Sequence, residues 1–100
     1  MKIVVFGGYG AQGQVICREL LKHPKVSEVM CSGRRLEQAK RFVSRFKDKK
    51  LSANKTDLDN INEINAAIKN VDLVINAASY IYNLRLMKAC AKNGVNYQDL

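Results

Sequence analysis

Two hydrophobic periodicities alternate along this chain, and together they predict its secondary structure. Short runs rich in valine and isoleucine, bounded by glycine or polar residues, are typical of β-strands. Between these runs, apolar residues recur at three- and four-residue steps, which is the pattern of helices with one buried face. The predicted strands are 2–6, 26–32, 50–55, 71–76 and 95–99, and the predicted helices are 11–22, 35–46, 61–68 and 82–92.

The order of these elements predicts a fold class. Strands and helices alternate with short connections, which favours a parallel sheet with right-handed crossovers and helices on both faces. We therefore predict an α/β, doubly wound, Rossmann-like fold with about five strands, formed by residues 1–100 as one domain. For the third helix, the sequence offers Asp57 or Asp59 as the N-cap region.

A glycine-rich turn follows the first predicted strand and opens the first predicted helix. Gly8, Gly10 and Gly13 match the spacing G-x-G-x-x-G, which in a strand–turn–helix setting is typical of dinucleotide binding. The first glycine is interpreted as permitting a tight turn, the second as letting amides approach a diphosphate, and the third as letting helix and strand pack closely. The intervening residues are also predicted to bind the cofactor: Tyr9, Ala11 and Gln12. The alternative is a glycine turn that binds nothing.

Composition and charge argue against several other classes of protein. The formal net charge is +8, but the 17 lysines and arginines are scattered through every segment and no nucleic-acid-binding signature accompanies them. No apolar stretch approaches the roughly 18 residues of a membrane span. We therefore predict a cytoplasmic protein with neither nucleic acid nor membrane as a partner. The three cysteines are widely spaced, which argues against both a disulfide framework and a zinc site.

A combination of motifs points to a family. The segments that carry it are Val5–Gly13, Ser32–Arg35, Val74–Ala78 and Cys90–Asp99. Together they resemble the N-terminal part of the saccharopine dehydrogenase family. The resemblance implies an oxidoreductase that transfers hydride between a nicotinamide cofactor and a carbon–nitrogen bond of an amino-acid-derived substrate. It also implies that this chain is the cofactor-binding part of a longer enzyme, which binds a small amino-acid-like substrate outside these residues and whose catalytic residues are not identified here.

The end of the second predicted strand bears on the choice of dinucleotide. NAD-binding sites of this type usually place an acid about 20 residues after the glycine turn, where it binds the ribose hydroxyls. This chain instead has Ser32 and Gly33, followed by Arg34 and Arg35. Because guanidinium groups bind phosphate bidentately, we predict NADP rather than NAD, with Ser32, Arg34 and Arg35 at the cofactor. The alternative is that both arginines are solvated residues at the start of a helix.

Further candidate cofactor-binding residues follow the third and fourth predicted strands. Asp57 lies where related folds often place a polar residue near the adenine, with an N-cap role as an equal alternative. Asn76, Ala77 and Ala78 lie at the carboxyl end of the fourth strand, the side on which open α/β sheets bind ligands. Small residues at this place let a cofactor pass close to the backbone. Simple packing between strand and helix is the alternative.

Two tyrosines after the fourth strand are candidates for the nicotinamide end of the site. Neither Tyr80 nor Tyr82 is followed four residues later by lysine, so the acid–base pair Tyr-x-x-x-Lys of short-chain dehydrogenases is absent. No catalytic acid or base is predicted in this chain.

The leading hypothesis is therefore the NADP-binding part of a saccharopine-dehydrogenase-like oxidoreductase, in which the protein binds and orients a cofactor that performs the hydride chemistry. A nucleotide-sensing regulatory domain without catalysis is the second hypothesis. The missing acid after the second strand counts against it. The sequence leaves the oligomeric state open, with a homodimer as one candidate assembly.

Overall fold

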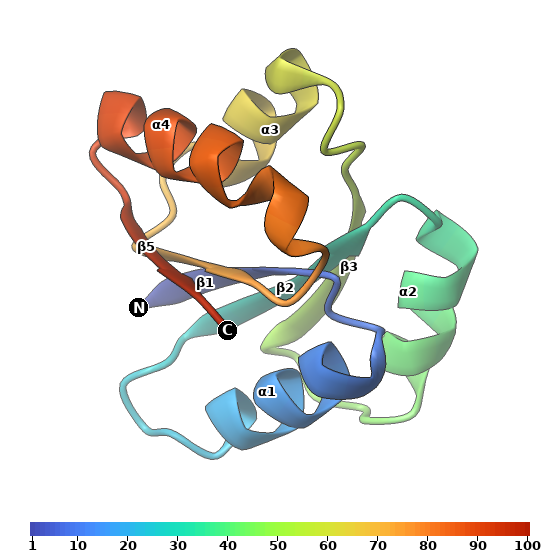
Figure 1. Ribbon diagram of the computed structural model, residues 1–100. Helices are drawn as coiled ribbons and strands as arrows, with labels where there is room; N and C mark the ends of the chain where they lie inside the picture. Colours follow the sequence, from blue (N-terminus) through green and yellow to red (C-terminus); the bar gives the residue numbers. More distant parts are fainter.

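The computed structural model describes every residue from Met1 to Leu100. Strands and α-helices alternate along the chain (Figure 1). The strands are β1 (Lys2–Phe6), β2 (Glu28–Gly33), β3 (Leu51–Lys55), β4 (Leu73–Asn76) and β5 (Asn96–Asp99). The helices are α1 (Ala11–Leu21), α2 (Leu36–Ser44), α3 (Ile61–Ile68) and α4 (Asn83–Asn93), with a 3₁₀ turn, η1 (Tyr80–Tyr82), before α4. Every predicted strand and helix is confirmed, with ends that differ by a few residues.

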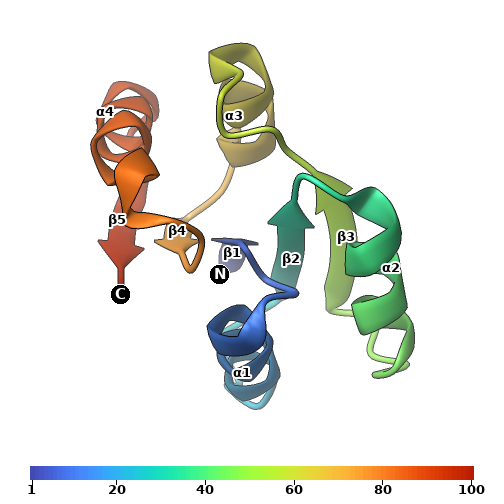
Figure 2. The same cartoon turned by 45° about the vertical axis from the view of Figure 1, so that its right-hand side comes forward.

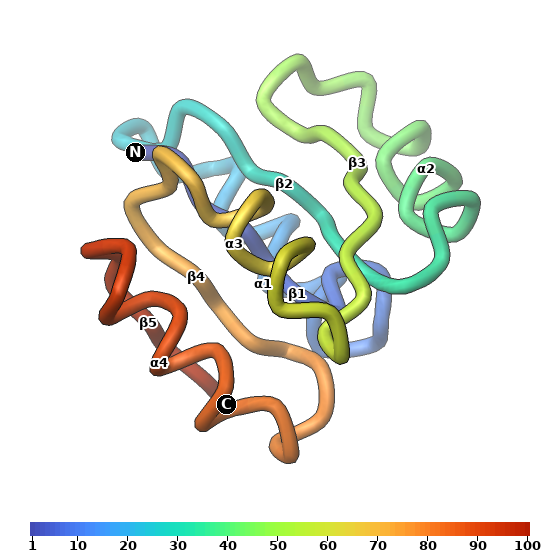
Figure 3. Tube along the Cα trace, turned by 90° about the horizontal axis from the view of Figure 1, so that it is seen from above, coloured from blue at the N-terminus to red at the C-terminus, as the bar shows by residue number.

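All the strands belong to one parallel sheet, in the order β3-β2-β1-β4-β5. The central strand β1 pairs with β2 on one side, where Ile3 lies beside Val29, and with β4 on the other, where Ile3 lies beside Leu73. Seen from above (Figure 3), β3 and β5 form the two edges of the sheet. Helices α1 and α2 cover one face and α3 and α4 the other (Figure 2), which confirms the doubly wound α/β fold.

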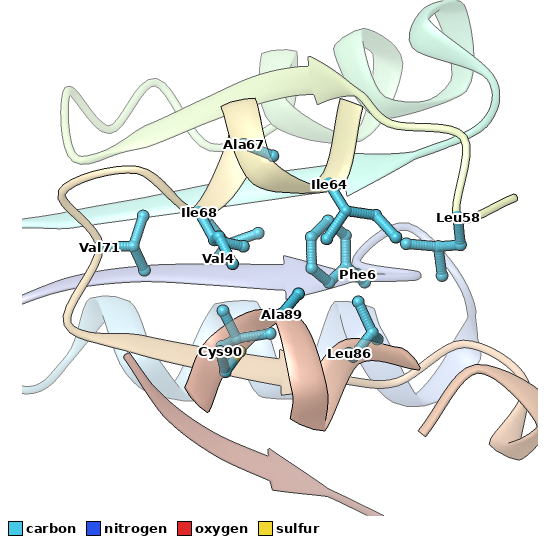
Figure 4. Packing of buried hydrophobic residues seen from close by; sticks show 11 residues of the cluster. Val4, Phe6, Leu58, Ile64, Ala67, Ile68, Val71, Leu86, Ala89 and Cys90 are labelled. Atoms are coloured by element: carbon cyan, nitrogen blue, oxygen red, sulfur yellow. The ribbon is translucent and has the colours of Figure 1, made fainter. Parts of the chain in front are cut away.

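The side chains of β1 alternate between two separate hydrophobic cores, because successive residues of a strand point to opposite faces. Val4 and Phe6 enter the core beneath α3 and α4 (Figure 4), whereas Ile3 and Val5 enter the core beneath α1 and α2. All four side chains are buried. A parallel strand covered on both faces needs a continuous apolar run, which is why no polar residue interrupts β1 after Lys2.

The start of α3 differs from the prediction. Neither Asp57 nor Asp59 caps this helix. Asn60 does so, because its Oδ1 accepts hydrogen bonds from the backbone amides of Asn62 and Glu63. The Glu63 carboxylate turns back and accepts hydrogen bonds from the Asn60 side chain and the Asp57 amide, in a variant of the capping box. Asn60 thus supplies the capping oxygen that was expected from Asp57 or Asp59.

The cysteines are small residues of the core. Cys17, Cys31 and Cys90 are buried, and none of them forms a disulfide. No group of three or more histidine, cysteine, aspartate or glutamate side chains is placed to hold a metal ion. None of the helices has both the length and the apolar character needed to cross a membrane.

Candidate functional site

A cavity opens at the carboxyl ends of the strands, beside the place where the chain changes direction within the sheet. From β1 the chain builds outward to β2 and β3, and it then returns to the other side of β1 to form β4 and β5. Open α/β sheets bind ligands at such a switch point. The cavity volume is about 290 Å³. Its lining residues are Phe6, Gly7, Tyr9, Gly10, Gly33, Arg34, Thr56, Leu58, Ala77, Ala78 and Tyr82.

Backbone hydrogen bonds hold the turn after β1 against β2. The amides of Gly7 and Gly8 both donate to the carbonyl oxygen of Ser32, at 2.8 and 3.3 Å, and the amide of Gly10 donates to the carbonyl oxygen of Gly7 at 3.0 Å. Gly7 has a φ of 75°, a left-handed conformation that residues with a Cβ rarely adopt. The positive φ of the turn thus falls on Gly7, the residue before the first glycine of the G-x-G-x-x-G spacing.

The other glycines of the turn permit close packing or close approach. A Cβ on Gly8 would lie 2.7 Å from the Sγ of Cys31, and a Cβ on Gly13 would overlap the carbonyl oxygen of Gly7. Gly13 thus lets α1 begin directly against the turn. A Cβ on Gly10 would meet only the Gly7 carbonyl oxygen, at 3.3 Å. Of these three glycines, Gly10 therefore has the most open space at the position of a Cβ.

The start of α1 presents free hydrogen-bond donors. The backbone amides of Tyr9, Ala11, Gln12 and Gly13 donate to no group of the protein. No acidic residue lies in the first turn of α1. Free amides and the positive end of a helix dipole together favour a bound anion. This donor set fits a diphosphate group.

Ser32 supports the site from within the sheet. Its side chain is completely buried, and its hydroxyl is hydrogen-bonded to Thr56 Oγ1 at 2.7 Å and lies 3.0 Å from Asn54 Oδ1. Ser32 was predicted to lie at the cofactor, but it is not among the residues that line the cavity. The structure instead gives Ser32 the role of holding the glycine turn through its carbonyl oxygen.

Tyr9 forms one wall of the cavity by lying across the end of β2. Its ring packs so closely on Gly33 that a Cβ there would overlap the ring. The Tyr9 hydroxyl accepts a hydrogen bond from the backbone amide of Arg35 at 3.0 Å, and its carbonyl oxygen accepts one from Gln14 Nε2 at 2.7 Å. Tyr9 is thus fixed at both ends. The Arg35 side chain is exposed and does not line the cavity.

Arg34 lines the cavity, and its guanidinium is paired with an acid. Arg34 Nη2 lies 3.3 Å from Asp59 Oδ2. The same carboxylate lies 3.6 Å from Arg85 Nη1 and accepts a hydrogen bond from the Tyr82 hydroxyl at 3.1 Å. No acidic residue follows β2 directly in the sequence, but the loop between β3 and α3 places Asp59 beside Arg34. Tyr82 therefore lies on the arginine side of the cavity.

Two residues of the loop after β3 line the cavity, but the predicted residue of this loop, Asp57, is not one of them. Asp57 Oδ1 accepts a hydrogen bond from the Asp59 amide at 2.9 Å, and Asp57 is not part of the lining. Thr56 and Leu58 line the cavity instead. The sequence carried a signal for this, because a single leucine between two aspartates in a polar loop is expected to turn inward.

Asn76 fixes the loop that carries Ala77 and Ala78 to the cavity. Its side chain is buried, its Oδ1 accepts a hydrogen bond from the Ala78 amide at 2.9 Å, and its Nδ2 donates to Asn83 Oδ1 at 2.7 Å. Asn83 Oδ1 also accepts a hydrogen bond from the Tyr97 hydroxyl at 2.9 Å. The two alanines thus form the cavity wall, and the three polar side chains hold that wall from behind.

The Tyr97 hydroxyl makes the stability of the fold sensitive to alkaline pH. Burial raises the pKa of Tyr97 to about 12, from 10.0, and burial raises the pKa of Cys90 to about 11, from 9.0. Both groups are protonated in the folded chain at a pH where they ionise in the unfolded chain. The stability that these two groups contribute to the fold is therefore complete below about pH 9 and is lost as the pH rises toward about 12.

We expect the melting temperature, followed by circular dichroism, to fall over this alkaline range. The fall should be shallower in Tyr97→Phe, because the variant has no hydroxyl to ionise at this position. Tyr80→Phe is the matched control, since the Tyr80 side chain is 80% exposed, and it should follow the wild-type curve. Equal slopes for the wild type and Tyr97→Phe would contradict the assignment.

A family model describes nearly the whole chain. The saccharopine dehydrogenase NADP binding domain matches residues 3–100, which include the glycine turn, Arg34 and the loop after β4. The chain belongs to this family. The resemblance drawn from the sequence motifs is thereby confirmed, and the chain is a nicotinamide-dinucleotide-binding domain of the dehydrogenase and reductase type.

Solved structures share the fold of this saccharopine dehydrogenase NADP-binding domain. The X-ray structure of Pen from Bacillus thuringiensis aligns with 97% of the chain at a TM-score of 0.86 and 18% identity. Apo saccharopine dehydrogenase (L-Glu forming) from Saccharomyces cerevisiae aligns with 98% of it at a TM-score of 0.85 and 15% identity. The triphenylmethane reductase of Citrobacter sp., in complex with NADP(H), aligns with 96% at a TM-score of 0.75 and 20% identity. The chain spans 36%, 21% and 35% of these three chains, respectively.

The cavity of this NADP-binding domain offers groups that bind and orient, and none that is an ordinary acid–base catalyst. Its lining contains one guanidinium, one threonine, two tyrosines, glycines and apolar side chains, but no histidine, lysine, cysteine or carboxylate. Both tyrosine hydroxyls already have partners within the protein. This arrangement is suited to the recognition of a dinucleotide.

Proposed function

We propose that this chain binds NADP(H) at the switch-point cavity and serves as the cofactor domain of an oxidoreductase that acts on a carbon–nitrogen bond of an amino-acid-derived substrate. The observation that carries the proposal is the set of free amides at the start of α1, which follows directly on Gly10 of the cavity lining, together with Arg34 in the same lining. Ala11 and Gln12 themselves are not lining residues. The amides suit a diphosphate. Arg34 suits a 2′-phosphate, the group that distinguishes NADP from NAD.

Each wall of the cavity has a role in this proposal. The amides of Ala11 and Gln12 would hold the diphosphate, and Gly10 would leave the space for its approach. The apolar side chain of Leu58 and the ring of Tyr9 would cover the adenine part of the cofactor and exclude water from it. Bound NADP(H) supplies the hydride chemistry, and the protein supplies position and electrostatics.

The substrate and the catalytic groups belong, in this proposal, to a part of a longer enzyme. The cavity lining has no titratable acid or base apart from hydrogen-bonded tyrosines. The chain also spans only 21% of the yeast saccharopine dehydrogenase chain that it resembles in fold. A second part of such an enzyme would close over the carboxyl edge of the sheet, where the cavity opens.

Titration of the chain with NADPH and with NADH tests the proposal directly. Binding is followed through the fluorescence of the reduced nicotinamide, at equal ionic strength for the two nucleotides. We expect saturable binding of both, with the lower Kd for NADPH. Absence of saturable binding for either nucleotide would overturn the proposal.

Arg34→Glu should weaken NADPH binding by about 30-fold, because it removes a charge-assisted hydrogen bond to phosphate and adds a repelling carboxylate. NADH binding should change little, since NADH has no 2′-phosphate. The same titrations measure both affinities. Lys40→Glu makes the same change of charge at an exposed position of α2 outside the cavity lining and should leave both affinities near those of the wild type. Unchanged NADPH binding in Arg34→Glu would remove the argument for NADP.

A further inference from the structure

One carboxylate beside the cavity is shared by three donors that come from different parts of the chain. Asp59, in the loop before α3, pairs with Arg34 from the end of β2 and with Arg85 from α4, and it accepts the Tyr82 hydroxyl. Only Arg34 and Tyr82 of these residues line the cavity. Asp59 therefore lies outside the cavity lining but in contact with Arg34, the cation that is suited to a phosphate.

The two arginines converge on this acid but differ in how firmly they are held. Arg85 is anchored a second time, because its Nη1 donates to the carbonyl oxygen of Leu58 at 2.8 Å. Arg34 has Asp59 as its one side-chain partner, and its side chain is 63% exposed. A phosphate that enters the cavity thus meets an arginine whose charge is already partly neutralised, and a carboxylate that repels it.

We infer that Asp59 is a specificity-determining residue that limits the preference of this site for a 2′-phosphorylated dinucleotide. It competes with the phosphate for Arg34 and opposes the phosphate by like charge. The inference rests on the proposed function, because it concerns the same cofactor site. It concerns a residue that lies outside the cavity lining and that the sequence pattern for dinucleotide choice does not include.

The geometry favours an Asp59 that competes with the phosphate for Arg34 over an Asp59 that holds Arg34 in place for the phosphate. Exposed ion pairs contribute little, so the Arg34–Asp59 pair is readily exchanged for a pair with a more highly charged phosphate. Arg34 follows β2 directly and its neighbour Gly33 is already held under the Tyr9 ring. The base of the Arg34 side chain is therefore placed at the cavity by the backbone, without help from Asp59.

Asp59→Asn tests the inference, because it removes the charge and retains an oxygen that can accept the Tyr82 hydrogen bond. We expect the Kd of NADPH to fall about fivefold, the upper range for release of an exposed ion pair. The Kd of NADH should remain within about twofold of the wild-type value. Both values come from nicotinamide fluorescence titrations. Asp59→Ser removes the same charge with a smaller side chain and should give the same direction of change.

Two controls separate this effect from a general change of charge. Glu28→Gln removes an acid that pairs with Lys2 at the amino-terminal end of β2, and it should leave the ratio of the two Kd values unchanged. In an Arg34→Ala background, Asp59→Asn should improve NADPH binding by less than in the wild type, because the competition for Arg34 is gone and only the like-charge repulsion between Asp59 and the phosphate remains.

The outcomes distinguish this inference from the proposed function. If the wild type binds neither nucleotide, the proposed function fails and the inference fails with it. If the wild type binds NADPH but Asp59→Asn leaves its Kd unchanged or raises it, the inference alone is overturned. An equal gain for NADPH and NADH also overturns it, because the acid would then act on the whole nucleotide and not on the 2′-phosphate.

Discussion

Gly13→Ala should destabilise the fold by about 3 kcal/mol, because the new Cβ would overlap the carbonyl oxygen of Gly7. Helix propensity alone predicts the opposite, since alanine inside a helix is favoured over glycine by about 1 kcal/mol. For a domain of this size, the expected loss corresponds to a melting temperature lower by more than about 10 °C. The sign of the change in melting temperature therefore tells whether the clash with the glycine turn or the higher helix propensity of alanine decides the stability at this position.

Thermal unfolding of Gly13→Ala, followed by circular dichroism without nucleotide, measures this effect. Lys40→Ala is a suitable control, because it places alanine at an exposed position of α2 whose side chain makes no hydrogen bond or ion pair. It should melt near the wild type. A Gly13→Ala variant that melts at or above the wild-type temperature would show that α1 does not lie directly against the glycine turn.

Unlike Gly13→Ala, the substitution Gly10→Ala should weaken cofactor binding and leave the stability of the fold largely unchanged. Gly10 has φ −73° and ψ 173°, which alanine adopts readily. Its Cβ would meet only the Gly7 carbonyl oxygen, at 3.3 Å. The methyl group would instead occupy the space through which a diphosphate approaches the free amides of α1. We expect NADPH affinity to fall by at least about tenfold, because the amide hydrogen bonds to the phosphate would be lengthened or lost.

Melting curves with and without NADPH separate the two effects in one experiment. A ligand at about 100 times its Kd stabilises the wild type by about 2.7 kcal/mol. Gly10→Ala should melt within a few degrees of the wild type without nucleotide and should lose most of the shift that NADPH produces. If the shift persists in full, the diphosphate does not pass close to Gly10, and the assignment of the free amides as its binding site is wrong.

The fold could be predicted from local sequence because each element carries its own signal. β1 has an unbroken apolar run from Ile3 to Phe6, and α2 has its buried Ala39 and Phe42 at a helical step. The sequence signal for β3 is weak, since Ser52 and Asn54 interrupt its apolar positions. β3 forms a strand because it lies at an edge of the sheet, where one side needs no partner and polar residues are tolerated.

The site was only partly predictable, because the roles of several of its residues depend on contacts between residues that are far apart in the sequence. Gly7 and Gly8 are adjacent glycines, and the sequence does not show which of them takes a positive φ. The backbone of the structure shows that it is Gly7. Ser32 could not be placed inside the sheet without knowing that Thr56 lies beside it. Asp59 reaches Arg34 across 25 residues of chain, and no spacing rule for dinucleotide sites covers that distance.

The position of β1 also has a consequence for the synthesis of the protein. Its partners are β2, which follows within thirty residues, and β4, which begins only at Leu73. A nascent chain emerges from its amino terminus, so one side of this apolar strand stays unsatisfied until β4 has left the ribosome. Open apolar strand edges recruit other chains. The central strand, whose residues enter both cores of the finished domain, is thus the strand that waits longest for its second partner while the chain is being made.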